Sequence, residues 1–138
     1  MNIEQTITEY FSKQPEVIAV YLFGSYARNR SRLDSDVDLA ILFASNIKPE
    51  LFYNLEMKYF QELSRKIPKN FDVVNLNRAG ELLVYEVFRL GFLIYQRDPV
   101  KRLEYQTRRI CGYLDFSPLM FRMRKGMMKK LREGISHG

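Results

Sequence analysis

The sequence predicts a single α+β domain in which four short strands alternate with helices. The chain of 138 residues has the size of one typical domain. Four of its segments have strand length, and between them apolar residues recur every three or four positions, which is the helical period. We therefore expect residues 1–138 to form one domain with the element order helix, strand, turn, strand, helix, strand, helix, strand, helix, helix.

The first half of the chain supplies two strands and two helices. Residues 17–23 are a continuous apolar run rich in strand-forming residues, and Gly24-Ser25 ends it. After a polar, arginine-rich stretch, residues 36–43 predict the second strand. The first helix ends near Pro15 and carries Ile3, Ile7, Tyr10 and Phe11 at helical spacing. The second helix begins at Pro49, ends at Pro68, and carries Phe52, Leu55, Tyr59, Leu63 and Ile67.

The second half supplies two further strands and three helices. Residues 71–76 and 92–95 predict the third and fourth strands, and a helix from about 79 to 90 lies between them and is closed by Gly91. The helix after Asp98-Pro99 has one apolar side, made of Val100, Leu103, Ile110 and Leu114. Ser117-Pro118 predicts the start of a last helix, whose apolar stripe is Leu119, Met123, Met127 and Leu131.

Composition excludes several classes of protein. No apolar run approaches the roughly 18 residues of a membrane-spanning helix, and the N-terminal residues lack the charged and apolar regions of a signal peptide. Cys111 is the single cysteine and His137 the single histidine, so an intrachain disulfide is excluded and a zinc site is not expected. We therefore expect a soluble, cytoplasmic protein that does not associate with membranes.

Positive charge is concentrated in the last third of the chain. Residues 1–96 contain 11 Lys and Arg against 12 Asp and Glu, whereas residues 97–138 contain 11 against 4. This asymmetry predicts an acidic partner surface or a polyanion near the C-terminus. A solvated basic helix face would have the same composition, so both interpretations stay open.

Two aspartates on one strand carry the most informative chemistry. Side chains alternate along a strand, so Asp36 and Asp38 should share one face while Val37, Leu39 and Ile41 point to the core. Two carboxylates this close repel each other, and a cation between them relieves the repulsion. Because Mg²⁺ prefers carboxylate oxygens together with substrate phosphates, the pair suits a metal–triphosphate complex.

Gly24 and Ser25, which ten residues separate from Asp36, end the first strand in a way that suits phosphate binding. Glycine allows close approach of the backbone, and a helical turn that opens at Ser25 would direct free N–H groups and a hydroxyl at the β- and γ-phosphates. Arg28 and Arg30 follow and would neutralise further phosphate charge. We predict Gly24, Ser25 and Arg28 as the phosphate-binding residues.

Asp72 is the third candidate carboxylate. If its strand lies beside the strand of Asp36 and Asp38, the three carboxylates could share two metal ions. Asp72 would then accept the proton of an attacking hydroxyl. The predicted catalytic and metal-binding set is Asp36, Asp38 and Asp72, although Asp72 could also be a solvated residue at a strand edge.

Gly24, Ser25, Asp36 and Asp38 match the Gly-Ser-X10-Asp-X-Asp signature, and the chain resembles the minimal nucleotidyltransferases of the polymerase-β superfamily. In length, in the Asp72 strand, in residues 92–95 and in its basic C-terminal tail it looks like the MntA-type members, which are antitoxin partners of HEPN-domain ribonuclease toxins. The resemblance implies a polymerase-β-type core: a mixed four-stranded sheet flanked by helices, with a helical C-terminal tail.

The resemblance also implies an activity. Its members use Mg²⁺, with two ions around ATP, to transfer AMP to a tyrosine hydroxyl near the active site of the partner toxin, which silences the toxin. The chain departs from the pattern at one place, because many relatives carry a second glycine shortly after the serine, where this chain has Asn29 and Arg30. Asparagine tolerates left-handed backbone conformations better than most residues, so the turn can still form.

Three alternatives remain open. A small-molecule nucleotidyltransferase that modifies aminoglycosides would have to attract cationic substrates, which a net charge of +6 opposes. A binding-only antitoxin would mask its toxin without chemistry, but that alternative is favoured by degraded motifs and these are intact. A nucleic-acid-binding module would use the basic C-terminal segment, whose interleaved aromatic residues occupy mostly core-like positions: Tyr105, Tyr113, Phe116 and Phe121.

Overall fold

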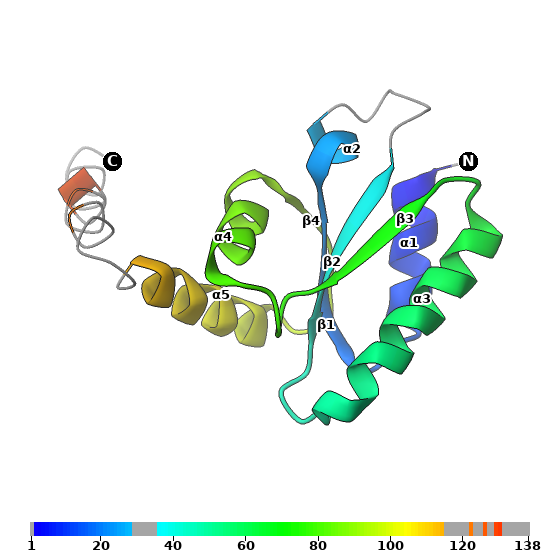
Figure 1. The fold of residues 1–138 in the computed structure, drawn as a ribbon, viewed down its shortest axis with the longest axis horizontal. Coiled ribbons are helices and arrows are strands. Elements are labelled where there is room, and N and C mark those ends of the chain that lie inside the picture. Colours follow the sequence, from blue (N-terminus) through cyan, green and yellow to red (C-terminus); the bar gives the residue numbers. More distant parts are fainter. Residues whose placement is uncertain (1, 29–35, 115–121, 123–125, 127–128, 131–138) are drawn as a thin grey trace.

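The computed structural model describes residues 2–28, 36–114, 122, 126, 129 and 130. Its centre is one mixed sheet in the order β3-β2-β1-β4 (Figure 1). The strands are β1 (Val17–Phe23), β2 (Val37–Phe43), β3 (Phe71–Asn75) and β4 (Phe92–Gln96). β1 pairs antiparallel with β2 and β4, whereas β2 and β3 are parallel. The predicted α+β fold with a mixed four-stranded sheet is confirmed.

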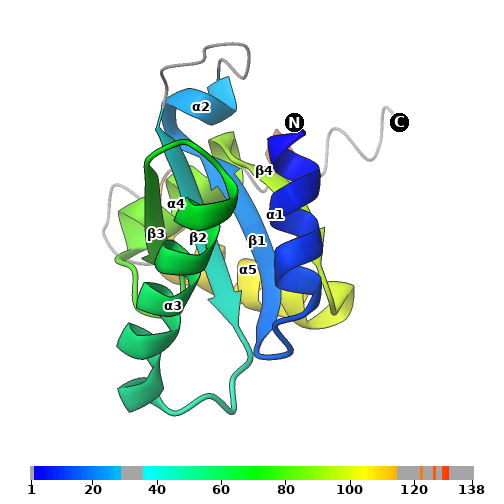
Figure 2. The ribbon, with the colours of Figure 1, turned by 90° about the vertical axis from the view of Figure 1, so that its right-hand side faces the viewer.

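Helices cover both faces of the sheet. α1 (Ile3–Ser12) and α3 (Phe52–Lys66) lie on one face, and α4 (Glu81–Leu90) and α5 (Pro99–Leu114) lie on the other (Figures 1 and 2). A short helix, α2 (Gly24–Arg28), follows β1, and a 3-10 turn, η1 (Pro49–Leu51), precedes α3. Within the described ranges, no helix combines the length and apolar character that crossing a membrane requires.

The larger core fills the space between the sheet and the helices α1 and α3. Its fully buried side chains include Phe11, Leu22, Leu39, Ile41, Phe43, Tyr59 and Leu63. The rings of Phe11 and Tyr59 meet edge to face with 5.2 Å between their centres, a geometry that stabilises beyond the burial of area. The Tyr59 hydroxyl donates a hydrogen bond to Glu16, so the one polar atom of this ring is satisfied inside the core.

A second core lies on the opposite face, under α4 and α5. It contains the small or branched side chains of the sheet and of α4, namely Ala19, Ala40, Leu42, Leu76, Val84 and Val87, together with Tyr21. Ala40 and Leu42 follow Asp38 at intervals of two and share its face of β2, and both are buried. The charged face of β2 is therefore confined to the start of the strand, and the rest of that face is covered.

The predicted apolar side of the helix after Asp98-Pro99 is wrong for two residues, because Val100 and Leu103 are 64% and 51% exposed. Tyr105 and Arg109 occupy the packed side of α5 instead. The Tyr105 hydroxyl donates to the Leu76 carbonyl, and Arg109 donates to the same carbonyl at 3.0 Å and to the Ala79 carbonyl at 2.6 Å. Because the carbonyls in the connection after β3 need hydrogen-bond donors, polar side chains occupy this side of α5. The predicted stripe of the last helix, at 119, 123, 127 and 131, lies outside the described residues.

Candidate active site

Three strand ends meet at one edge of the sheet and bring the predicted site residues together. β1 ends at Phe23, which pairs with Asp38 across the antiparallel ladder, and Asp38 pairs with Asp72 across the parallel ladder. The backbone N–H of Val37 donates to the carbonyl of Asn70 at 2.9 Å, which ties the start of β2 to the segment before β3. The carboxylate-bearing ends of β2 and β3 therefore lie next to the end of β1. Asp36 lies just before β2, because the strand begins at Val37, one residue later than predicted.

The backbone geometry at position 24 requires glycine. Its φ is +77°, a backbone conformation that other residues adopt only at a cost. A Cβ atom at this position would lie 2.0 Å from the Oδ2 atom of Asp38. Two members of the sequence signature are thus in direct apposition, because the carboxylate of Asp38 occupies the space that a side chain at position 24 would need.

A helix, α2, opens at Gly24, one residue before Ser25, where the helical turn was expected to open. It is fixed to the larger core by Tyr26 and Ala27, both buried, and the Lys69 ammonium lies 5.5 Å from the centre of the Tyr26 ring. The side chains of Ser25 and Arg28, and all of residues 29–35 with Asn29 and Arg30, lie outside the part that the structure describes. Their phosphate contacts therefore stay predictions.

The three aspartates differ in their surroundings. Asp36 and Asp72 are exposed, whereas Asp38 is partly buried. Burial raises the pKa of the Asp38 carboxyl, and the negative charges of Asp72 and then Asp36 raise it further. The charged form of Asp38 is thus disfavoured by its own site, and a bound cation would reverse that penalty.

The carboxylates of this site can be compared with the ligands that a metal ion requires. Among the described residues, no three His, Cys, Asp or Glu side chains are gathered into a site that could hold a metal ion. Mg²⁺ in phosphate-transfer sites usually takes one or two protein carboxylates and completes its shell with phosphates and water. The paired carboxylates beside a glycine turn fit that division, with Asp36 and Asp38 as the residues that would hold the ion.

Two hollows flank this row of strand ends. One, of about 230 Å³, lies beside Gly24 and is lined by Phe23, Glu86 and Leu90. The other, of about 270 Å³, lies between α3 and β3 and includes Asp72 in its lining. We call the second hollow the α3–β3 groove. The row of site residues therefore has one open space on the side of β1 and α4, and another on the side of β3 and α3.

The residues of α3 that line this groove are not among the predicted site residues. They are Tyr53, Glu56, Met57 and Phe60. The signal was present, because Tyr53, Met57 and Phe60 are spaced by four and three positions and form a second helical stripe beside the core stripe. Periodicity alone does not tell which of two apolar stripes faces the core.

Comparison with known proteins places these features in a family. The family model "Polymerase beta, Nucleotidyltransferase" matches residues 5–100. A relative, the protein adenylyltransferase MntA of Shewanella oneidensis, is 30% identical over 77 residues, which make up 56% of this chain and 52% of MntA. The match thus spans about half the length of that relative.

Two solved structures share the fold. A crystal structure of a toxin–antitoxin with AMP-PNP has a TM-score of 0.64 at 22% identity, covering 93% of this chain and 99% of that one. The tri-AMPylated Shewanella oneidensis HEPN toxin in complex with its MNT antitoxin gives a TM-score of 0.65 at 20% identity, covering 91% and 96%. With the family model matched over most of the chain, this protein belongs to the polymerase β nucleotidyltransferase family.

Proposed function

We propose that this nucleotidyltransferase is a Mg²⁺-dependent protein adenylyltransferase, which moves AMP from ATP to a tyrosine hydroxyl of a HEPN-type ribonuclease toxin and so acts as its antitoxin. The observation that carries the proposal is the row formed by Gly24, directly after β1, Asp38 on β2 and Asp72 on β3. The similarity to MntA, and the fold shared with an antitoxin whose HEPN toxin is tri-AMPylated, support the choice of AMP and of a protein acceptor.

Each residue of the row has a role in this proposal. Asp36 and Asp38 would hold Mg²⁺ against the triphosphate, and the ion would offset the negative charge of the phosphates when bound. Gly24 and Ser25, with Arg28, would bind the β- and γ-phosphates. The hollow beside Gly24 supports this arrangement, because it leaves open space next to the turn.

The transfer is a displacement at the α-phosphorus of ATP. The acceptor oxygen forms a bond to this phosphorus while the bond to the bridging oxygen of the β-phosphate breaks, and pyrophosphate leaves with the bonding electrons. Asp72 takes the proton of the acceptor hydroxyl and then releases it to solvent. Its exposed carboxylate, on the strand next to Asp38, is suited to this exchange.

The proposal is tested with labelled ATP, Mg²⁺ and a HEPN-domain toxin as the candidate acceptor. We expect wild-type protein to add labelled AMP to that protein, and Asp36→Asn or Asp38→Asn to abolish the transfer. Asp72→Asn should lower kcat by about 10²–10⁴-fold and leave the affinity for a non-hydrolysable ATP analogue largely intact, because general-base help is given in the transition state. Full turnover in any of these variants would refute the role of that carboxylate.

The alternatives give different results in the same experiment. A binding-only antitoxin would inhibit the ribonuclease while the mass of the toxin stays unchanged. A small-molecule nucleotidyltransferase would transfer AMP to an aminoglycoside and leave the toxin unlabelled. The intact carboxylate row favours an enzyme over the binding-only alternative.

A further inference from the structure

We propose that the acceptor protein docks in the α3–β3 groove, through a segment that is apolar and basic and that presents its hydroxyl to Asp72. This inference rests on the proposed function, since it concerns the protein that receives AMP. It adds to that function the surface on which specificity for the acceptor depends.

The order of residues across the sheet sets the side from which the acceptor approaches. In an in-line displacement the attacking and leaving oxygens lie on opposite sides of the phosphorus. In the proposed function the turn at Gly24 would hold the leaving pyrophosphate on the side of β1, and Asp38 lies on the strand between β1 and β3. The acceptor must therefore arrive from the side of β3. The α3–β3 groove opens on that side and includes Asp72.

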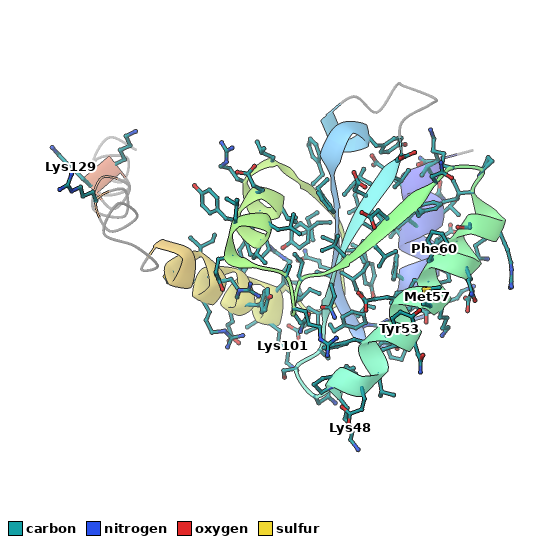
Figure 3. The ribbon with its side chains drawn as sticks, in the orientation of Figure 1. Lys48, Tyr53, Met57, Phe60, Lys101 and Lys129 are labelled. Atoms are coloured by element: carbon teal, nitrogen blue, oxygen red, sulfur yellow. The ribbon has the colours of Figure 1, made fainter. Side chains whose placement is uncertain are left out.

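The wall of the groove formed by α3 is an exposed apolar stripe. Tyr53, Met57 and Phe60 are 68%, 36% and 40% exposed, and Figure 3 shows them following one another along α3. The core side of this helix is supplied by other residues, among them Tyr59 and Leu63, so the stripe is not needed to hold α3 on the sheet. Exposed aromatic and methionine side chains that gather on one surface are typical of the centre of protein interfaces.

The charge of the groove indicates the chemistry of its occupant. Besides Tyr53, the residues of its lining with ionisable side chains are Glu56 and Asp72, both acidic. Burial raises the pKa of the Glu56 carboxyl, and Arg78 opposes this shift. A lysine or arginine of the acceptor beside Glu56 would match this charge, and complementary charges favour both encounter and register.

The other wall belongs to an edge strand. β3 is the last strand of the sheet that the structure describes, so one row of its backbone groups has no strand partner there. A segment that runs along β3 can use these groups for main-chain hydrogen bonds, a common way of binding an extended peptide. Side chains of that segment would then contact the stripe on α3, while its hydroxyl lies near Asp72.

The test compares two double variants of the same helix. Tyr53→Glu with Phe60→Glu places charge in the apolar stripe, whereas Asn54→Glu with Gln61→Glu adds the same charge at exposed polar positions next to it. With labelled ATP and the same HEPN-domain toxin, we expect the groove variant to raise KM for the acceptor at least about tenfold and the control variant to leave it near wild type. The affinity for a non-hydrolysable ATP analogue should be unchanged in both variants, which also verifies that they fold.

A second comparison tests the charge. Glu56→Gln should raise KM for the acceptor several-fold at low salt and less at high salt, because screening weakens the charge interaction. Glu50→Gln, at an exposed position in η1, is its control and should have no effect.

The possible outcomes separate a failure of the docking inference from a failure of the proposed function. If wild-type protein modifies the toxin and the groove variant does so with an unchanged KM, the docking inference is refuted while the proposed function stands. If wild-type protein does not modify the toxin, the proposed function fails and the inference fails with it. If the chain alone is a dimer that Phe60→Glu converts to a monomer, a second copy occupies the groove and the inference is overturned.

Discussion

At the scale of single residues, Asp38 carries the most constraints. It pairs with Phe23 on one side and with Asp72 on the other, and its carboxylate lies where a Cβ of residue 24 would be. Its pKa is raised by burial and by the two neighbouring carboxylates. A residue kept in a position that disfavours its own charged form is more readily explained by chemistry than by stability.

The first prediction follows from this cost. In metal-free buffer at neutral pH, Asp38→Asn should be at least as stable as the wild type, because it removes a carboxylate whose charged form the fold disfavours. The folded state binds the Asp38 proton more tightly than the unfolded state does, so wild-type stability rises as pH falls through the raised pKa toward the ordinary value of 3.8. The difference in free energy of unfolding between Asp38→Asn and the wild type should therefore shrink over that pH range. Urea unfolding at several pH values measures it, and an advantage that grows with acidity would contradict the assignment.

The second prediction concerns Gly24. Gly24→Ala should lower stability by more than about 1–2 kcal/mol, since a left-handed backbone alone costs that much, and should displace the Asp38 carboxylate and weaken binding of Mg²⁺ and ATP. Gly112→Ala is the matched control: it lies in α5, and its new Cβ would be 3.8 Å from Oε2 of Glu81, an ordinary van der Waals contact. That control should gain about 0.4–1 kcal/mol. Equal effects of the two substitutions, measured by thermal unfolding, would argue against a close approach of residue 24 to the Asp38 carboxylate.

At the scale of elements, α5 is held by polar contacts with the connection after β3. Arg109 is 15% exposed, donates to the carbonyls of Leu76 and Ala79, and lies 3.4 Å from Glu81 as an ion pair. These contacts join α5 to the segment that leads from β3 into α4. Arg109, with Tyr105 beside it, therefore contributes to the position of α5.

The third prediction tests this dependence. Arg109→Met should lower the free energy of unfolding by about 1.5–3 kcal/mol, the usual value for hydrogen bonds to a charged group, because it leaves the Ala79 carbonyl without this donor. Arg108→Met, on the exposed side of the same helix, should change stability by less than about 1 kcal/mol. Chemical unfolding of the two variants makes the comparison, and similar losses in both would mean that α5 is held by its apolar contacts.

At the scale of the whole molecule, charge is divided along the chain. Residues 1–96 are nearly neutral and residues 97–138 are strongly basic. Net charge at this scale acts on encounter with partners and on solubility rather than on the fold. The site at the sheet edge is built within the nearly neutral part of the chain.

The fourth prediction concerns the basic part. Reversal of Arg124, Lys125 and Lys129 to Glu should slow association with a protein partner and weaken the complex mainly at low salt. The affinity for a non-hydrolysable ATP analogue should stay unchanged, because the site residues lie elsewhere in the chain. Association rates at two salt concentrations measure the effect. If RNA is the partner instead, the slope of log affinity against log salt should fall by about 0.7–0.9 per charge removed.

Sequence reasoning located the strands and the signature residues because both depend on local patterns. The runs at 17–23 and 36–43 have strand length, and the spacing from Gly24 to Asp38 matches the Gly-Ser-X10-Asp-X-Asp signature. It did not locate the packed side of α5, because the carbonyls that Tyr105 and Arg109 satisfy lie some thirty residues away in the chain. Nor did it give the register that pairs Asp38 with Asp72, which exists only once β2 and β3 are parallel neighbours.

The buried hydroxyl of Tyr59 gives this chain a spectroscopic reporter of its own unfolding. The chain has nine tyrosines and no tryptophan, so its near-ultraviolet absorbance reports tyrosine. Burial and the hydrogen bond to Glu16 raise the pKa of Tyr59, whereas Tyr53 is 68% exposed. In an alkaline titration, exposed phenols should ionise first and reversibly, and Tyr59 should ionise only as the chain unfolds. Because the folded state holds this proton more tightly, stability falls as pH rises beyond the ordinary value of 10, and Tyr59→Phe should diminish the late absorbance change.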